Sequence, residues 1–505
     1  MEKILNLDPL IGKGRRVEAH WPWPRAIVPA EGWRDAIAML AAGERTLLSL
    51  WGEPRSVHMA LLDEPQGSVA VLSFDCPDGS FPSVAEAHPP AIRLERTIRD
   101  LFGLEPVGLA DQRPWLDHGH WGVSHPLGAR SGDVAPQAAY VFLPAEGESL
   151  HQIAVGPVHA GIIEPGHFRF TANGETVVRL EERLGYVHKG IDGLIAGADL
   201  DKAAKLAGRT SGDSTVAYAL AFARAVEAAV NIDAPPRAHY LRALMAELER
   251  LANHFGDIGA ICNDASFSLM HAHCSILRER VLRFADAAFG HRLMMDRVVP
   301  GGVAADMAPG SGEKLRALLD EIRKAFPRLI ELYDNTASLQ DRTVGTGILK
   351  HELARRFAPG GYVGRASGRN FDARKALPYP PYDTFRFDVP SREDGDVNAR
   401  VWIRIDEVQE SLSLIDQMAQ LMPGGAVKVD VPPNAGEGFA LVEGFRGDVL
   451  ASVKLGSDGR VANCHLRDPS WFQWPLLEAV IEGNIVADFP LCNKSFNCSY
   501  SGHDL

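Results

Sequence analysis

PPRAHYLRALMAELERLANH, residues 235–254, predicts a long amphipathic helix. Proline is tolerated in the first turn of a helix, so Pro236 marks where this helix begins. Leucines recur three or four residues apart along it and therefore share one face. Further helical patterns cover 202–231, 266–289, 312–338, 403–421 and 471–483. Long helices bury their apolar faces against one another, so we expect a helical bundle.

The first 135 residues show shorter patterns. Some have helical spacing and others are rich in strand-forming side chains. The expected helices are 32–48 and 91–101, and the expected strands are 56–61 and 67–74. A run of small and polar residues, GARSGDVAPQ at 128–137, is the expected domain boundary.

These patterns predict the α+β class. We expect a small α/β-sandwich-like domain at 1–135, a linker at 136–150, and a large domain at 151–505. The large domain has a helical-bundle core and peripheral β-hairpins. One hairpin, with an Asn-Gly turn, is predicted over 168–180, and a second over 448–461.

Charge and hydropathy narrow the class of function. The chain has 52 basic and 65 acidic side chains, a net charge of −13. Nucleic-acid binding requires a basic face, so we expect no such partner. No apolar run reaches the roughly 18–20 residues of a membrane helix, and the first residues lack the layout of a signal peptide. We expect a cytoplasmic protein, and if it acts at a membrane, other subunits must hold it there.

Motifs along nearly the whole chain indicate a family. Residues 95–127 (ERTIRDLFGLEPVGLADQRPWLDHGHWGVSHPL) resemble the 30-kDa-type subunit of respiratory complex I. Residues 156–170 (GPVHAGIIEPGHFRF) resemble the opening of the 49-kDa-type subunit, in the form found in formate-hydrogenlyase-type hydrogenases. The resemblance continues at 186–190 (YVHKG), 235–254, 300–303 (PGGV), 443–447 (EGFRG) and 467–470 (RDPS). The chain thus resembles a fused large core subunit of the group 4 nickel–iron hydrogenase and complex I family.

In that family two Cys-x-x-Cys pairs hold a nickel–iron centre, because soft thiolates suit these metals. The first pair falls on Arg209-Thr210-Ser211-Gly212-Asp213-Ser214, which keeps the scaffold residues Arg209 and Gly212 but has serines in place of both cysteines. The second pair falls on Cys498 and Ser501. The resemblance therefore implies degenerate ligand positions and no metal bound by this chain. An alternative is that Ser211 and Ser214 cap a helix.

The resemblance also bears on quinone binding. In complex I a histidine and a tyrosine contact the quinone head group, and these positions fall on Ile163 and Gly212 here. Neither side chain can hydrogen-bond a carbonyl, so the resemblance does not carry the usual quinone contacts over to this chain. Tyr218 and Tyr500 are substitutes by position, or core aromatics with satisfied hydroxyls.

Four polar residues are candidates for a catalytic role along the same cavity: Asp213, Tyr218, His188 and Glu182. His503 and Asp504 could line the same region. Such groups can relay protons, since histidine titrates near neutral pH. They can equally form a structural network of buried hydrogen bonds.

Two histidine-containing runs are weaker candidates for metal binding. They are DHGHWGVSH at 117–125 and HAHC at 271–274. Zinc requires four donors at converging positions, and neither run has such a spacing, so we expect no metal at either. No dinucleotide or Walker motif is present, so NAD or ATP binding by those devices is not expected.

The resemblance implies the remaining expectations. A small-subunit-like iron–sulfur partner carries a 4Fe-4S cluster, and antiporter-like and anchor subunits hold the chain on the inner face of the cell membrane. The chain couples electron transfer from that partner to an acceptor such as a quinone. The alternative is a non-catalytic scaffold or coupling subunit. A working hydrogenase is contradicted by the loss of three of the four ligands.

Overall fold

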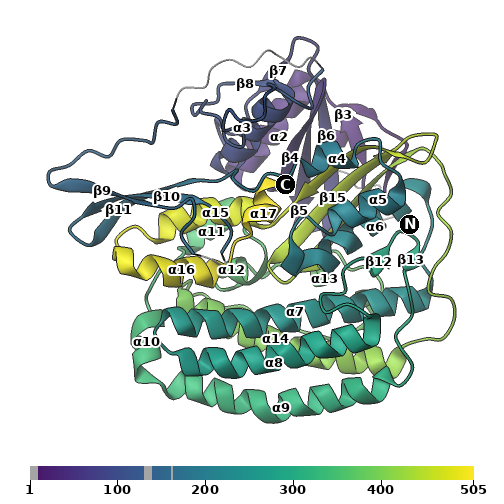
Figure 1. Ribbon diagram of the computed structural model, residues 1–505. Helices are drawn as coiled ribbons and strands as arrows, with labels where there is room; N and C mark the ends of the chain where they lie inside the picture. Colours follow the sequence, from purple (N-terminus) through teal and green to yellow (C-terminus); the bar gives the residue numbers. More distant parts are fainter. Residues whose placement is uncertain (1–8, 130–138, 161–162) are drawn as a thin grey trace.

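The computed structural model describes residues 9–129, 139–160 and 163–505 (Figure 1). Helices and mixed sheets occur together along the chain, which confirms the α+β class. The N-terminal unit lies on one side of the molecule, the long helices lie on the other, and the C-terminal segment lies between them. The predicted boundary at 128–137 falls mostly outside the described residues. No helix within the described ranges is long and apolar enough to cross a membrane.

The N-terminal unit is built on a five-stranded sheet in the order β1-β3-β6-β5-β4, flanked by α2 and α3. Its elements are α1 (Pro9–Gly12), β1 (Arg15–Arg16), β2 (His20–Trp21), β3 (Arg25–Ile27), α2 (Ala30–Ala42), β4 (Thr46–Glu53), β5 (Ser56–Asp63), β6 (Ser68–Asp75), β7 (Ser80–Pro82), η2 (Pro89–Ala91), α3 (Ile92–Phe102) and β8 (Glu105–Val107).

The expected helix 32–48 is wrong at its C-terminal end. Gly43 takes φ 72°, and its backbone N–H bonds to the last turn of α2, which closes the helix. The next residues form β4, whose interior is buried on both faces of the sheet. A strand buried on both faces reads as a continuous apolar run, which is why its sequence does not alternate.

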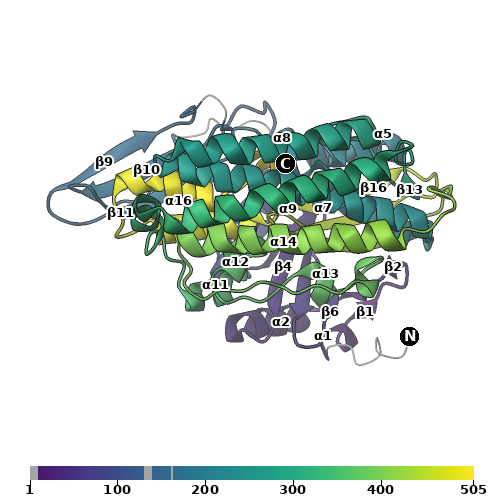
Figure 2. The same ribbon diagram turned by 90° about the horizontal axis from the view of Figure 1, so that it is seen from below.

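Four long helices lie side by side in both views (Figures 1 and 2). They are α7 (Pro236–Asp264), α8 (Ser268–Phe289), α9 (Ser311–Asn335) and α14 (Val397–Leu421). The predicted leucine face of α7 is fully buried, at Leu241, Leu244, Leu248 and Leu251. The bundle is therefore confirmed. Short elements connect it to the rest: β12 (Val298–Val299), β13 (Gly302–Val303), α10 (Ala337–Thr343), α11 (His351–Phe357), α12 (Gly361–Arg365), α13 (Ala373–Ala376) and η4 (Tyr382–Thr384).

The continuous helix expected at 202–231 is wrong. The chain forms α5 (Leu200–Ala207), leaves the helix, and forms η3 (Gly212–Ser214) and α6 (Thr215–Val230). The Thr215 hydroxyl donates to the carbonyl of Gly208 at 2.6 Å. The Glu249 carboxyl group accepts from the backbone N–H groups of Val216 and Ala217 at 2.7 and 3.1 Å. A carboxyl group from α7 thus satisfies the first donors of α6 and starts a new helix.

A second sheet, in the order β16-β15-β14-β2, packs against α6. Its C-terminal strands are β14 (Gly436–Gly444), β15 (Gly447–Leu455) and β16 (Val461–Arg467). A Cβ on Gly438 would lie 1.8 Å from the carbonyl oxygen of Ala225, so only glycine allows this close approach of helix and strand. The hairpin predicted over 448–461 is formed by β15 and β16, and β15 is largely buried against α6 rather than peripheral. β2 comes from the first 135 residues, so the two predicted domains share this sheet.

The hairpin predicted over 168–180 is present, with its turn exposed and its strands largely buried. β9 (Leu150–Val155), β10 (His167–Asn173) and β11 (Thr176–Arg183) form a sheet that projects from the body (Figure 1). The short helix α4 (Ile191–Ile195) follows this sheet in the chain. The last elements come after the second sheet: α15 (Ser470–Val480), η5 (Val486–Asp488), α16 (Phe489–Phe496) and α17 (Tyr500–Asp504).

Candidate functional site

The two halves of the degenerate ligand set meet where α5 ends and α6 begins. Ser211 lies in the break before η3, and its hydroxyl is 2.9 Å from that of Ser499, between α16 and α17. The Trp474 indole N–H donates to the Ser499 carbonyl at 3.2 Å, and the Ser499 N–H donates to the Ser470 hydroxyl at 2.9 Å. The C-terminal segment is thus held against the start of α6 by hydrogen bonds.

An arginine that the sequence patterns left without a role organises this site. Arg446, at the turn between β14 and β15, donates to the two carboxylate oxygens of Asp213 at 2.8 and 2.5 Å. It also donates to the Ser214 hydroxyl at 3.1 Å. The Ser211 hydroxyl donates to Asp213 at 2.8 Å. We call Arg446, Asp213, Ser211, Ser214 and Ser499 the Arg446 cluster.

Burial and charge oppose each other at Asp213. The Arg446 side chain is 5% exposed and that of Asp213 is 37% exposed. Burial acts to raise the pKa of Asp213, but the adjacent Arg446 guanidinium and the serine hydroxyls outweigh it, and the pKa lies below its ordinary value. Asp213 is therefore an anion at neutral pH.

The helix-capping interpretation of the serines is wrong. Neither Ser211 nor Ser214 accepts a backbone N–H as a cap. Both hydroxyls face Asp213 instead, and Glu249 takes the capping role. Burial raises the pKa of Glu249 to about 8, against the opposing effect of the two N–H donors.

The remaining ligand positions, Cys498 and Ser501, are poor electron donors for a metal. The Cys498 thiol is buried, and its Sγ lies 3.9 Å from Oε1 of Gln473. Burial and the nearby Glu182 carboxyl raise the pKa of Cys498 well above its usual range, so it stays a neutral thiol. The Ser501 backbone N–H donates to Glu164 at 3.0 Å.

This donor set does not fit a nickel–iron centre. Three hydroxyls and one neutral thiol replace four thiolates, and a guanidinium lies among them. Among the described residues, no three His, Cys, Asp or Glu side chains converge in a metal-binding arrangement. A hollow of about 10 Å³ adjoins Asp213, about the space of a single water.

Tyr218 and Arg209 do not reach the Arg446 cluster. Tyr218 is fully buried and donates its hydroxyl to Asp468 at 2.7 Å. Arg209 points outward and forms a bidentate pair with Asp296 at 2.5 and 2.8 Å. Gly212 is exposed, and a side chain at its position would meet open space. Ile163 packs against the core.

Glu182 belongs to a second cluster, which we call the Arg93 cluster: Arg93, Glu182 and Glu478. Arg93 comes from α3 of the N-terminal unit and donates to Glu182 at 3.2 Å; it also pairs with Glu478 at 2.7 Å. Glu182 is fully buried, and its Oε1 has no hydrogen-bond partner among the described residues. Burial and the Glu478 carboxyl raise the pKa of Glu182 well above its ordinary value. Two carboxyls thus share one cation and can retain a proton.

His188 is attached to the C-terminal helix instead. Its Nδ1 lies 2.7 Å from the carbonyl oxygen of Asp504, and its ring packs against Trp121. His503 bonds to the Asp504 carboxylate at 2.8 Å and stacks on Trp471. The Tyr500 hydroxyl lies 3.5 Å from Nε2 of a further histidine, His159. These histidines therefore have protein partners, and none of them joins the Arg446 cluster.

Several residues of the two histidine-containing runs have protein partners or point to solvent. His118 and His125 bond to backbone carbonyls of Leu184 and Arg99 at 2.7 and 2.8 Å. On α8, His271 and His273 are exposed, whereas Cys274 is buried.

The sequence patterns did not single out Arg446, Arg93 or Glu478. Arg446 stands in the EGFRG motif, and its place in a family motif is the one signal that could have found it. Arg93 and Glu478 lie on ordinary helical patterns and become neighbours of Glu182 only through tertiary contacts.

Comparisons with known proteins identify the family of this chain. Residues 27–131 match the family "Respiratory-chain NADH dehydrogenase, 30 Kd subunit", and residues 264–435 match "Respiratory-chain NADH dehydrogenase, 49 Kd subunit". Formate hydrogenlyase subunit 5 of Escherichia coli is 31% identical over 86% of this chain and 78% of its own length.

Two further relatives match about two thirds of the chain. The carbon monoxide-induced hydrogenase of Rhodospirillum rubrum is 31% identical over 69% of this chain and 98% of its own length. A subunit of the NADH-quinone oxidoreductase of Dehalococcoides mccartyi is 31% identical over 66% of this chain and 92% of its own length. The chain therefore belongs to the family of group 4 nickel–iron hydrogenase and respiratory complex I core subunits, with the 30-kDa-like and 49-kDa-like parts fused.

Proposed function

We propose that this chain is the core subunit of a redox-driven, membrane-associated complex that works without a nickel–iron centre in this subunit. The observation that carries the proposal is the Asp213–Arg446 pair, at 2.8 and 2.5 Å, inside the degenerate ligand motif. A guanidinium beside the former ligand positions repels a metal cation and neutralises the Asp213 carboxylate. Soft-metal binding needs anionic sulfur, and the one thiol here stays protonated.

The relatives support partner subunits for this chain, because they are named as subunits or components of larger assemblies. In the proposal a complex I small-subunit-like protein carries a 4Fe-4S cluster and delivers electrons. Antiporter-like and anchor subunits hold the chain at the inner, cytoplasmic face of the membrane.

The proposed electron acceptor is a quinone or a molecule of similar polarity. Ile163 and Gly212 offer it no side-chain hydrogen bond, and the anionic Asp213 can accept but not donate one. The N–H donor is therefore assigned to the Arg446 guanidinium, which Asp213 holds in place. Glu182 and Glu478 hold a proton in the Arg93 cluster, which can accompany the electrons.

A second candidate is a non-catalytic coupling or scaffold subunit. One observation favours it: the hydroxyls of Tyr218 and Ser211 are committed to protein partners, Asp468 and Asp213. Groups already paired in a buried site specify a rigid structure.

The experiment uses the intact complex purified from membranes. Nickel and iron are measured per chain, and oxidation of the reduced complex by a soluble quinone is followed with wild type, Asp213→Asn and Asp201→Asn. Asp201 is exposed on α5 and serves as the matched control. We expect no stoichiometric nickel, and loss of quinone-dependent oxidation in Asp213→Asn alone.

Stoichiometric nickel overturns the proposal. Quinone-dependent oxidation that is equal in all three proteins, or absent from the wild type, favours the non-catalytic subunit. Circular dichroism and subunit composition of each variant show whether the complex has assembled.

A further inference from the structure

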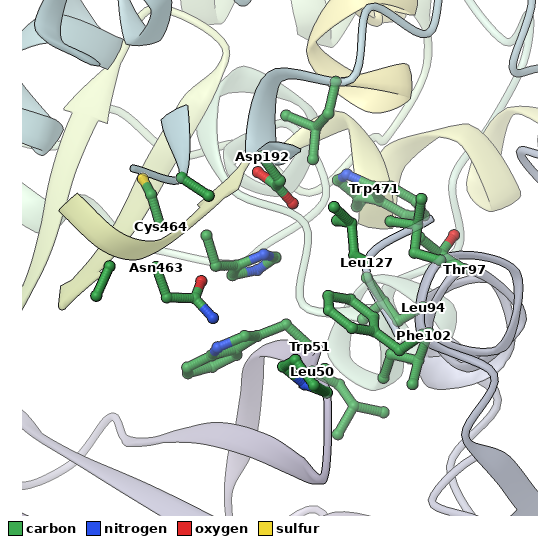
Figure 3. A pocket seen from close by; sticks show the side chains of 18 residues that line it. Leu50, Trp51, Leu94, Thr97, Phe102, Leu127, Asp192, Asn463, Cys464 and Trp471 are labelled. Carbon is green, nitrogen blue, oxygen red and sulfur yellow. The ribbon is translucent and has the colours of Figure 1, made fainter. Parts of the chain in front are cut away.

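A cavity of about 170 Å³ lies between the N-terminal unit and the second sheet (Figure 3). One wall is apolar and comes from α3 and β4, with Leu50, Leu94, Ile98 and Phe102. The opposite wall comes from β16 and α15, with Cys464, His465 and Trp471. Three exposed residues also line the cavity, Pro54, Ala196 and Ala462, so it opens to solvent between them.

One carboxyl oxygen in this cavity has no hydrogen-bond donor among the described residues. Asp192, on α4, lines the cavity, and Figure 3 shows its carboxylate directed into the space. Its Oδ1 is buried and has no hydrogen-bond partner there. Burial raises the pKa of Asp192 to about 7. A buried acceptor without a donor is unfavourable unless a ligand or water supplies one.

The volume of the cavity and the residues that line it restrict the ligands that can bind. An apolar cavity of about 150 Å³ accommodates benzene, so this one has room for a single six-membered ring with a small substituent. The indole of Trp51 and the indole of Trp471 border the space and offer aromatic faces. The Asp192 oxygen calls for a donor, and a charged donor forms the stronger bond with a carboxylate.

We propose that this cavity binds a small amphipathic amine, a single aromatic ring with a protonated amino group that donates to Asp192. The ring lies between the apolar side chains of α3 and the aromatic residues opposite. The site is separate from the Arg446 and Arg93 clusters, and the inference does not depend on the proposed redox function.

The test measures binding of two probes to the purified protein in its complex. Benzylamine has the ring and the amine, whereas toluene has the ring alone. Binding is measured by saturation-transfer NMR and calorimetry in wild type, Asp192→Asn, and the exposed control Asp201→Asn. We expect Asp192→Asn to weaken benzylamine binding about tenfold or more, since a charge-assisted hydrogen bond is lost. We expect toluene binding to change less than about twofold, because toluene makes no such bond.

A filling variant locates the binding independently of Asp192. Thr97 lines the cavity from α3 and is half-buried, and Thr97→Phe places a ring in the space. We expect it to weaken both probes while leaving the folded signal unchanged. Benzylamine binding that is equal in wild type and Asp192→Asn overturns the proposal. So does binding that survives Thr97→Phe, or the absence of binding at millimolar benzylamine.

Discussion

The Arg446 cluster and the Arg93 cluster both shift the pKa of the Cys498 thiol, yet the charges within the two clusters balance differently. In the Arg446 cluster one guanidinium meets one carboxylate, and the serine hydroxyls bond to that carboxylate or to each other. In the Arg93 cluster one guanidinium meets two carboxyls, and Oε1 of Glu182 is left without a partner among the described residues. A closed polar network thus includes Ser211 and Ser214, two of the four former ligand positions, whereas the neighbouring cluster keeps the capacity to hold a proton.

Removal of Arg446 tests the closed network and has the largest expected effect. Arg446→Gln leaves Asp213 without its cation and removes the bond from Nε to the Asn497 carbonyl. Breaking a buried ion pair costs about 3–5 kcal/mol, and because Asp213 is partly exposed we expect about 3 kcal/mol. The free energy of unfolding is measured by chemical denaturation at neutral pH.

Arg460→Gln is the matched control for that measurement. Arg460 and Asp458 form an exposed pair at 4.0 Å, and such pairs contribute at most about 1 kcal/mol. If Arg446→Gln costs no more than this control, the Arg446 cluster does not hold the C-terminal segment in place.

Tyr218→Phe tests whether the Tyr218 hydroxyl contributes to stability or to catalysis. The change removes the hydrogen bond to Asp468, and we expect a loss of about 1–2 kcal/mol in the free energy of unfolding. Quinone-dependent oxidation by the complex should remain. A variant that folds with wild-type stability but loses oxidation would place Tyr218 in a catalytic role.

Glu182→Gln tests the proton-holding cluster and has the smallest expected effect. The folded-state pKa of Glu182 is raised by burial and by Glu478, whereas the unfolded value is about 4.3. Between these values the native state binds a proton that the unfolded state has released, so the wild-type free energy of unfolding falls as pH rises. The variant lacks this decrease.

The measurement compares unfolding of wild type and Glu182→Gln across the pH range from about 4 to 8. We expect similar stability near pH 4 and a relative gain of about 1 kcal/mol for the variant at the alkaline end, where an unpartnered charge is avoided. Glu105→Gln, at an exposed position, is the control. Parallel pH profiles for wild type and Glu182→Gln would contradict a shared proton in the Arg93 cluster.

Local sequence signals predicted much of the fold. The leucine spacing of α7 and its proline start are properties of neighbouring residues, and the structure places both as expected. The break between α5 and α6 could not be predicted this way. The alanine-rich segment favours helix throughout, and the interruption is stabilised by Glu249, a residue more than thirty positions away on α7.

The sequence by itself determined the family, the helical bundle and the loss of three cysteine ligands, because each depends only on residue types and on short spacings along the chain. Only the tertiary structure decided what surrounds the former ligand positions. Arg446 reaches Asp213, and Arg93 reaches Glu182, across separations that no local pattern encodes. Hydrogen-bond satisfaction and charge balance depend on which groups become neighbours after the helices and the two sheets have packed.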